Sequence, residues 1–147
     1  MREPIDVLLV GLGLIGREAA EAILGRTGLR LVGAVDADPA KAGRDLGEIL
    51  GLSAALGLPV LPDLRDALAR HRADIAVHCV NTLLDEAMEQ LEPLVDAGVD
   101  VVSANEQLGN AYAANPSLAS RLDRAAREAG VTILGTGTTP GFTSDYL

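Results

Sequence analysis

Short apolar runs alternate along this chain with longer segments in which apolar residues recur at helical spacing. We expect the apolar runs to be β-strands, at residues 7–10, 29–35, 59–61, 74–80, 99–103 and 131–134. The longer segments predict helices at about 14–24, 83–97 and 117–129, and Asp63 is placed to cap another. This alternation is typical of one doubly wound α/β domain. It predicts a parallel sheet of about six strands with helices on both faces, in the strand order 3-2-1-4-5-6.

A glycine-rich segment follows the first expected strand. Gly11, Gly13 and Gly16 form the pattern G-x-G-x-x-G between an apolar strand and a helix. Asp36 closes the second strand, about twenty residues further on. The first glycine permits a tight turn, the second lets a pyrophosphate approach the backbone, and the third lets the helix pack closely on the sheet. Residues 4–36 therefore predict a Rossmann unit that binds NAD(H) or NADP(H) at the helix start, and a purely structural turn is the alternative.

Asp36 bears on the choice between the two cofactors. A carboxylate at this position accepts hydrogen bonds from the adenosine ribose hydroxyls, and it favours NAD because a 2′-phosphate would meet a like charge. Lys41 and Arg44 are cations that either reach a 2′-phosphate or remain solvated on the surface. We expect NAD to be favoured modestly over NADP. The expected cofactor contacts are Gly11, Gly13, Leu14, Ile15, Gly16, Asp36, Ala37, Arg44, Asn81, Thr82, Ala104 and Asn105.

Polar residues also follow the fourth, fifth and sixth expected strands, at residues 81–82, 103–107 and 135–141. In parallel sheets, ligands bind beyond the carboxyl ends of the strands, so these segments are candidates for contacts with nicotinamide and substrate. His71, His78 and Cys79 are interpreted as structural residues, and no cluster of cysteine and histidine has the spacing of metal ligands. We therefore expect no metal site.

The composition narrows the range of partners. The formal net charge is −9, from 21 acidic and 12 basic residues, and a field of this sign repels the phosphate backbone of nucleic acids. No uninterrupted apolar run reaches the roughly 18 residues that span a bilayer. The segment after Met1 carries charges where a signal peptide needs apolar residues. We expect neither nucleic acid nor membrane as a partner, and a cytoplasmic location.

Several longer segments carry a family resemblance. They are VGLGLIGREAAEAIL, VGAVDADPAKAGRDLGEILGL, VDVVSANEQL and GVTILGTGTTPGF, of which GRDLGEILGL and GTGTTPGF are the most specific. The chain resembles the N-terminal half of the 2,4-diaminopentanoate dehydrogenase group, which includes native amine dehydrogenases and is related to dihydrodipicolinate reductase. The resemblance implies reversible, NAD(P)-dependent deamination of a primary amine to a ketone. It further implies a homodimer, with a C-terminal substrate domain that lies outside residues 1–147.

The resemblance also suggests a catalytic residue. Glu106 matches the first glutamate of the segment Cys-Glu-Glu-Leu in that family, where this chain has residues 105–108. It is expected to take the proton that an ammonium substrate must lose before hydride leaves its carbon; a solvated loop glutamate is the alternative. The chain departs from this segment at Asn105 and Gln107, and Thr138 and Thr139 stand where the family has an apolar residue and asparagine, so the resemblance leaves the identity of the substrate open.

Other functions remain open from the sequence. A relative of dihydrodipicolinate reductase or homoserine dehydrogenase would share the glycine-rich turn, but is not expected to carry GRDLGEILGL and GTGTTPGF together. A binding module that senses NAD(H) without catalysis is another possibility, because 147 residues alone do not enclose a substrate. The amine-type dehydrogenase is the preferred hypothesis.

Overall fold

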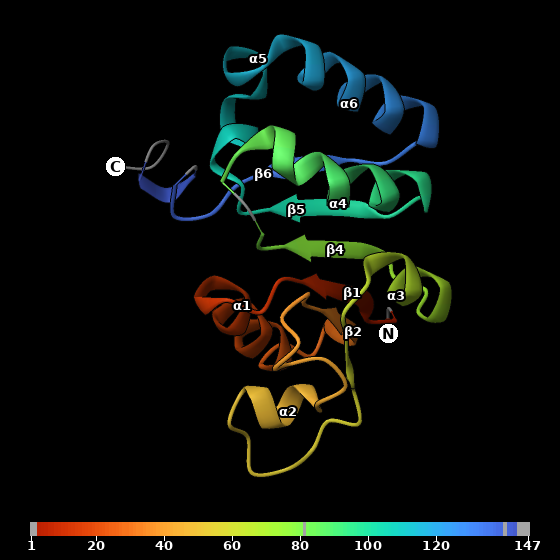
Figure 1. The fold of residues 1–147 in the computed structure, drawn as a ribbon, viewed down its shortest axis with the longest axis vertical. Coiled ribbons are helices and arrows are strands. Elements are labelled where there is room, and N and C mark those ends of the chain that lie inside the picture. Colours follow the sequence, from red (N-terminus) through yellow and green to blue (C-terminus); the bar gives the residue numbers. More distant parts are fainter. Residues whose placement is uncertain (1–2, 81, 140, 144–147) are drawn as a thin grey trace. The chain divides into compact units, whose positions relative to one another are not determined.

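The computed structural model describes residues 3–80, 82–139 and 141–143 of the chain. Within it the chain forms two compact units, Met1–Val77 and His78–Leu147. Strand β4 (Ile75–His78) ends on the first residue of unit 2. Each unit has its own strands and helices, most of which are labelled in Figure 1.

Unit 1 follows the order expected from the alternation of apolar runs. Its elements are β1 (Ile5–Val10), α1 (Leu14–Leu24), β2 (Leu29–Val35), α2 (Leu46–Ile49), β3 (Val60–Leu61), α3 (Leu64–Arg70) and most of β4. Strand β2 pairs in parallel with β1 on one side and with β3 on the other. The register of β1 against β2 shifts once, between Val7 and Leu8. As predicted, Asp63 caps α3, and its side chain accepts a hydrogen bond from the amide of Asp66.

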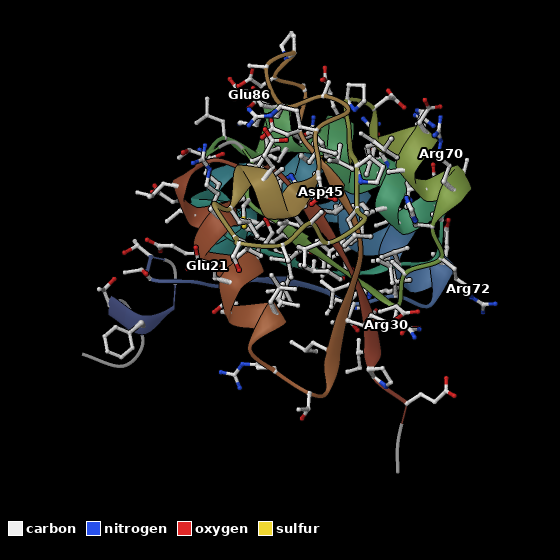
Figure 2. The ribbon with its side chains drawn as sticks, turned by 90° about the horizontal axis from the view of Figure 1, so that it is seen from below. Glu21, Arg30, Asp45, Arg70, Arg72 and Glu86 are labelled. Atoms are coloured by element: carbon white, nitrogen blue, oxygen red, sulfur yellow. The ribbon has the colours of Figure 1, made fainter. Side chains whose placement is uncertain are left out.

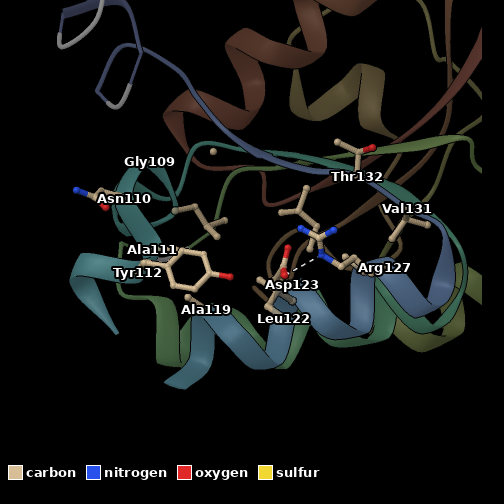
Figure 3. A pocket seen from close by; sticks show the side chains of 14 residues that line it. Gly109, Asn110, Ala111, Tyr112, Ala119, Leu122, Asp123, Arg127, Val131 and Thr132 are labelled. Carbon is tan, nitrogen blue, oxygen red and sulfur yellow. Dashed lines mark hydrogen bonds and ion pairs between the residues drawn. The ribbon is translucent and has the colours of Figure 1, made fainter. Parts of the chain in front are cut away.

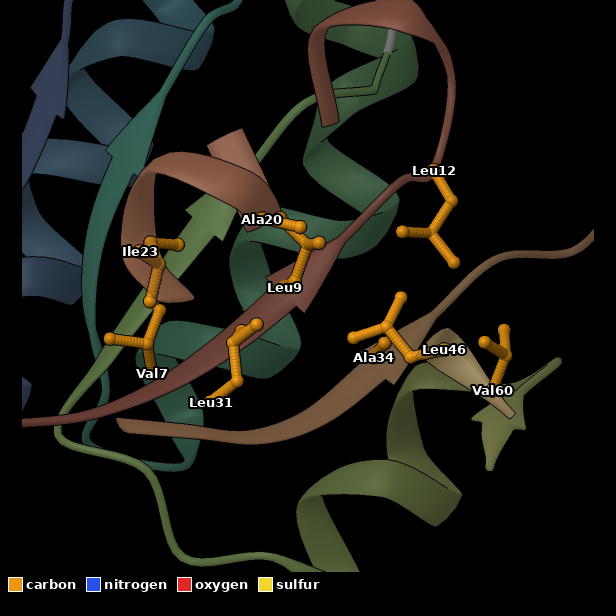
Figure 4. Packing of buried hydrophobic residues seen from close by; sticks show 9 residues of the cluster. All are labelled: Val7, Leu9, Leu12, Ala20, Ile23, Leu31, Ala34, Leu46 and Val60. Carbon is orange, nitrogen blue, oxygen red and sulfur yellow. The ribbon is translucent and has the colours of Figure 1, made fainter. Parts of the chain in front are cut away.

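The core of unit 1 lies between α1 and the strands, as Figure 4 shows. Strands that are buried on both faces are almost wholly apolar, which is why the first two strands show no alternation of polar residues. Helix α1 contributes small and branched side chains that pack closely on the strands. The buried cluster consists of Val7, Leu9, Leu12, Ala20, Ile23, Leu31, Ala34, Leu46 and Val60.

The segment between β2 and β3 is organised by Asp45, which is labelled in Figure 2. Its carboxylate accepts hydrogen bonds from the amides of Gly47 (2.8 Å), Leu56 (2.8 Å) and Leu58 (3.0 Å). Hydrogen bonds from these backbone amides, foremost that of Leu56, outweigh desolvation and lower the pKa of Asp45. The aspartate therefore caps α2 and closes a long loop, which accounts for the aspartate in the motif GRDLGEILGL.

Unit 2 contains α4 (Leu84–Asp96), β5 (Asp100–Ser103), the 3-10 helix η1 (Glu106–Asn110), α5 (Ala111–Ala114), α6 (Pro116–Ala129) and β6 (Ile133–Gly135). Strands β5 and β6 pair in parallel, and α4 packs on α6. Helix α6 begins at a cap, where Asn115 accepts a hydrogen bond from the amide of Leu118. It ends at Gly130, whose φ of 72° is the left-handed conformation that glycine adopts readily.

The predicted fold class is confirmed. The described strands follow the order β3-β2-β1-β4-β5-β6, which is the order expected from the sequence. Helix boundaries agree with the predicted ones to within a residue or two, and the short helices η1 and α5 form at residues 106–114, where no helix was predicted. In the part of the chain that the structure describes, no helix is long and apolar enough to cross a membrane.

Candidate functional site

The turn after β1 has the backbone geometry expected of a nucleotide-binding loop. Gly11 has a φ of 92°, which side chains other than glycine rarely adopt, and its amide donates to the carbonyl of Val35 (2.8 Å). Gly13 differs, because its φ of −70° suits any residue and a Cβ built on it would meet nothing within 4 Å. Neither strain nor close packing in the protein requires glycine at position 13. The open space above its backbone is therefore suited to a ligand that approaches closely.

The start of α1 lacks the groups that usually satisfy a helix N-terminus. Its N-cap residue is Gly13, no side chain caps it, and no acidic residue lies in the first turn. Gly16, in contrast, is buried on the packed side of the helix. Leu14 is 75% exposed and Ile15 is 52% exposed, so apolar side chains flank the uncapped amides. This arrangement fits an anionic group held by backbone amides, with apolar contacts beside it.

Asp36 connects this turn to the end of β2. Its carboxylate accepts hydrogen bonds from the amide of Leu12 (2.7 Å), the amide of Asp38 (2.9 Å) and the ammonium of Lys41 (2.9 Å). Burial acts to raise the pKa of Asp36, but the hydrogen bonds from Lys41 and the two amides together outweigh it and lower that pKa. The carboxylate is therefore ionised at neutral pH. It also fixes the backbone of the glycine-rich turn before any ligand binds.

The two cations near Asp36 have different partners. Lys41 lies between Asp36 and Asp38, with its ammonium 3.6 Å from the second carboxylate, and its side chain is only 18% exposed. Arg44 instead forms an ion pair with Glu48 of α2 at 2.7 Å. Ala37 is exposed beside Asp36. Of the two candidates for a phosphate-binding cation, only Lys41 contacts the carboxylate expected to bind the ribose.

In unit 2, the residues after β5 form a buried network. The hydroxyl of Ser103 is 2.8 Å from Nδ1 of His78 and accepts a hydrogen bond from the amide of Asn105 (3.1 Å). All three residues are buried, and burial lowers the pKa of His78 to about 4, so its ring is neutral at physiological pH. The amide of Ala104 donates to the carbonyl of His78 (2.9 Å). The interpretation of His78 as a structural residue is thus consistent with its contacts.

The side chains on either side of Glu106 contact the start of α4. Asn105 donates from Nδ2 to the carbonyl of Leu83 (3.2 Å), and Gln107 accepts from the amide of Leu84 (2.8 Å). Glu106 itself is exposed just beyond β5, where the sequence placed it. The contacts of Gln107 and of the Ser103 hydroxyl were not predicted from the sequence. The spacing from Asn105 to Leu108, where the asparagine accepts from the leucine amide, is a capping signal that would have predicted η1.

The motif GTGTTPGF begins at Gly135, the last residue of β6, and its residue 140 lies outside the described residues. A Cβ at Gly135 would lie 2.6 Å from the backbone of Leu108, so only glycine lets β6 pack against η1. Gly141 has a φ of 118° and is bridged to Gly137. Thr138 is exposed, and the hydroxyl of Thr139 is 2.6 Å from that of Thr143. The contacts of Gly135 and the backbone conformation of Gly141 therefore require glycine, whereas Thr138 and Thr139 are exposed.

The other predicted residues divide between the units. Gly11, Gly13, Leu14, Ile15, Gly16, Asp36, Ala37 and Arg44 belong to unit 1, and Thr82, Ala104, Asn105 and Glu106 to unit 2. Asn81 lies outside the described residues. Burial raises the pKa of the Cys79 thiol, so the thiol is protonated at neutral pH. Among the residues that the structure describes, no three of the types His, Cys, Asp and Glu are grouped so as to hold a metal ion.

A separate cavity in unit 2 involves none of the predicted residues. It measures about 510 Å³ and lies among η1, α5, α6 and β6, with Leu108, Tyr112, Leu122 and Ile133 in its walls. Figure 3 shows the ion pair between Asp123 and Arg127 at its edge. Two of the elements that line the cavity, η1 and α5, are short helices that the sequence pattern did not predict.

Comparisons with known proteins agree with the geometry of the turn. The chain is 30% identical to a 2,4-diaminopentanoate dehydrogenase from Acetoanaerobium sticklandii, over 99% of this chain and 41% of the relative. It is 32% identical to an amine dehydrogenase from Streptomyces virginiae, over 97% of this chain and 40% of the relative. The solved amine dehydrogenase from Mycobacterium smegmatis has a TM-score of 0.87 and 36% identity, covering 90% of this chain and 39% of that one.

These curated relatives are much longer than the present chain, which spans 41% and 40% of their lengths. Residues 5–110, which include the glycine-rich turn, Asp36 and Glu106, match the family described as the N-terminus of dihydrodipicolinate reductase. The match covers more than half of the chain. The chain therefore belongs to the dihydrodipicolinate reductase N-terminal family of NAD(P)-binding domains.

Proposed function

We propose that this chain is the cofactor-binding part of an NAD(P)-dependent dehydrogenase that acts on primary amines. The observation that carries the cofactor assignment is the open backbone at Gly13, which begins a helix with no side-chain cap. Backbone amides at such a helix start stabilise the pyrophosphate of a dinucleotide, and Leu14 and Ile15 add apolar contacts. The residues proposed to hold the pyrophosphate are Gly11, Gly13 and the first residues of α1.

The adenosine ribose is proposed to bind at Asp36 and Ala37. Asp36 is ionised and accepts from Lys41, so a ribose hydroxyl binds there by sharing or replacing that hydrogen bond. NAD suits the carboxylate because it presents no 2′-phosphate. Lys41 moderates the preference, since its ammonium is available to a 2′-phosphate once it turns from Asp36. We therefore propose binding of both cofactors with NAD favoured.

The proposed substrate class rests on similarity. Two relatives that match this chain over nearly its whole length are named as amine-type dehydrogenases, and the solved structure with the TM-score of 0.87 is an amine dehydrogenase. Because this chain spans less than half of those relatives, the reaction is proposed for the complete protein. A further substrate domain and a homodimer form part of that proposal.

We propose that Glu106 is the base in this reaction. An ammonium substrate has no lone pair on nitrogen, so it must transfer a proton to a base before its carbon can lose hydride. Glu106 is exposed just beyond β5, with its neighbours fixed by hydrogen bonds to α4. The bound nicotinamide supplies the acceptor for the hydride. Glu106 then releases the proton that left the ammonium to solvent, takes a second proton from the water that attacks the iminium carbon, and returns it to the nitrogen of the resulting carbinolamine, from which ammonia leaves to give a ketone.

Replacing Gly13 tests the cofactor assignment. We expect Gly13→Val to weaken NADH binding by about a hundredfold or more, since excluding the pyrophosphate removes several charge-assisted hydrogen bonds. The fold should survive, because the protein leaves the space at Gly13 empty. Gly28→Val is a matched control, for a Cβ at Gly28 also meets nothing within 4 Å. Calorimetry that finds equal NADH affinity in both variants would contradict the assignment.

Replacing Glu106 tests the chemistry. Glu106→Gln retains the size of the side chain and removes the base, so kcat for amine oxidation by the complete protein should fall roughly a hundredfold or more. NADH affinity should stay unchanged. Steady-state kinetics with a primary amine over pH 7 to 10 provide the measurement, and Glu89→Gln, which removes an exposed carboxylate from α4, is the control. A normal kcat in Glu106→Gln across that range would exclude Glu106 as the base.

A further inference from the structure

We infer that Gln107 is a positioning residue that, together with Asn105, fixes Glu106 against the start of α4. The inference rests on the proposed function, because it concerns the placing of the proposed base. It assigns a task to two side chains on either side of Glu106 that contact adjacent residues of one helix start.

Gln107 accepts from the first amide of α4, which the side chain of the N-cap residue cannot do, while Asp85 of the helix accepts from the amide of Glu86. The N-cap residue of α4 is Leu83, whose side chain has no oxygen to accept a hydrogen bond from the first turn. The amide of Leu84 instead donates to Oε1 of Gln107 at 2.8 Å. A cap normally comes from the residue that precedes the helix. Here it comes from η1, more than twenty positions later in the chain, so the helix start and η1 are held together.

Asn105 holds the other side of the same segment. Its Nδ2 donates to the carbonyl of Leu83 (3.2 Å), while its Oδ1 accepts from the amide of Leu108 (3.1 Å). Its own amide donates to the hydroxyl of Ser103 (3.1 Å), which is fixed in turn by the neutral ring of His78. Asn105 is fully buried, so these hydrogen bonds are protected from water.

Glu106 therefore lies between two anchored residues. A single turn of 3-10 helix has poor hydrogen-bond geometry and little stability of its own. The position of Glu106, the first residue of η1, is consequently set by contacts with residues outside η1. One of these contacts is the hydrogen bond of Gln107, whose side chain is partly exposed and takes no part in the buried network around Asn105. Loss of that contact should free Glu106 to move while the buried network around Asn105 keeps the fold.

The test compares variants of the complete protein at position 107. Gln107→Met retains the length of the side chain but lacks the amide oxygen, and Gln107→Glu restores an oxygen acceptor. We expect Gln107→Met to speed amide hydrogen exchange at the start of α4 and to lower kcat for amine oxidation roughly ten- to a hundredfold, because a displacement of about 1 Å has effects of that size. NADH affinity should be unchanged, and Gln107→Glu should recover most of both losses.

Asn115→Ala is the matched control for losing a helix cap. Asn115 caps α6 in the same unit, through the amide of Leu118, and its own amide donates to the carbonyl of Ala111 in α5. We expect faster exchange at the start of α6 with an unchanged kcat. If Gln107→Met speeds exchange at α4 but kcat stays normal while Glu106→Gln is impaired, the positioning role is wrong and the base assignment stands. If Glu106→Gln is itself fully active, the proposed base fails and the positioning role fails with it.

Discussion

At the scale of single residues, the carboxylate of Asp36 stabilises the turn at which the cofactor is proposed to bind. It accepts three hydrogen bonds, from Leu12, Asp38 and Lys41, and thereby ties the glycine-rich turn to the end of β2. Two of these donors are backbone amides. The third is a flexible ammonium, and we propose that a ribose hydroxyl replaces it or that a 2′-phosphate draws it away.

Lys41 is therefore expected to set how far NAD is preferred over NADP. Lys41→Met removes the cation and should lower NADPH affinity by roughly tenfold or more, since a hydrogen bond to a charged group is worth about 1.5–3 kcal/mol before solvent screening. NADH affinity should change much less, because its ribose hydroxyls still meet Asp36. Calorimetric titration with both cofactors measures the difference.

Arg65→Met is the control for loss of a positive charge. Arg65 is exposed on α3 in the same unit, so its removal should leave the ratio of NADH to NADPH affinity unchanged. If Lys41→Met lowers the affinity for NADH and for NADPH equally, the lysine supports the fold of the turn and does not bind the 2′-phosphate.

At the scale of elements, α2 depends on a close approach of two backbones. A Cβ at Gly47 would lie 2.7 Å from the carbonyl oxygen of Ala54 and 2.9 Å from the carboxylate of Asp45. Helix α2 has only four residues and little stability of its own, so this packing and the cap from Asp45 decide whether it forms. The same segment covers the buried side chains of Leu46 and Val60.

We expect Gly47→Ala to destabilise the protein by about 1–3 kcal/mol, because overpacking against a backbone carbonyl forces the loop to shift. Gly25→Ala is the matched control, since a Cβ there lies 3.6 Å from its nearest neighbour at ordinary contact distance and the φ of −75° suits alanine. Urea unfolding at neutral pH measures both. An unchanged midpoint for Gly47→Ala would mean that the loop tolerates the displacement without loss of packing.

At the scale of the whole molecule, the chain offers a candidate cofactor site but no enclosed space for a substrate among its described candidate residues. The chain spans 41% of the length of the similar 2,4-diaminopentanoate dehydrogenase. Positioning of a substrate against a cofactor is worth about 7–11 kcal/mol of the barrier, and it requires a surface that covers the reacting groups. Glu106, Thr138 and Thr139 are exposed in this chain.

The 147-residue chain is accordingly expected to bind NADH with little or no turnover, and the complete protein to oxidise primary amines. Fluorescence titration measures the first, and a panel of primary amines, ketones with ammonia, and a dihydrodipicolinate-type substrate measures the second. Robust amine oxidation by residues 1–147 alone would contradict this division. Tight NADH binding by the complete protein without turnover of any substrate would favour a sensing role.

The sequence by itself determined those features of this protein that depend on local pattern. Buried parallel strands must be apolar, and a glycine-rich turn between such a strand and a helix is typical of dinucleotide binding. The strand order could therefore be predicted from the alternation, the NAD(P)-binding unit from Gly11, Gly13 and Asp36, and the family from longer segments such as GRDLGEILGL. The tertiary structure decided what depends on contacts between distant segments. Gln107 caps Leu84, and Asp45 closes a loop. Asp36 pairs with Lys41, whereas Arg44 pairs with Glu48. None of these contacts produces a periodic pattern in the sequence. Each polar side chain has several possible partners, and the free energies of hydrogen bonding to them are similar. The fold decides which partner comes within hydrogen-bond distance.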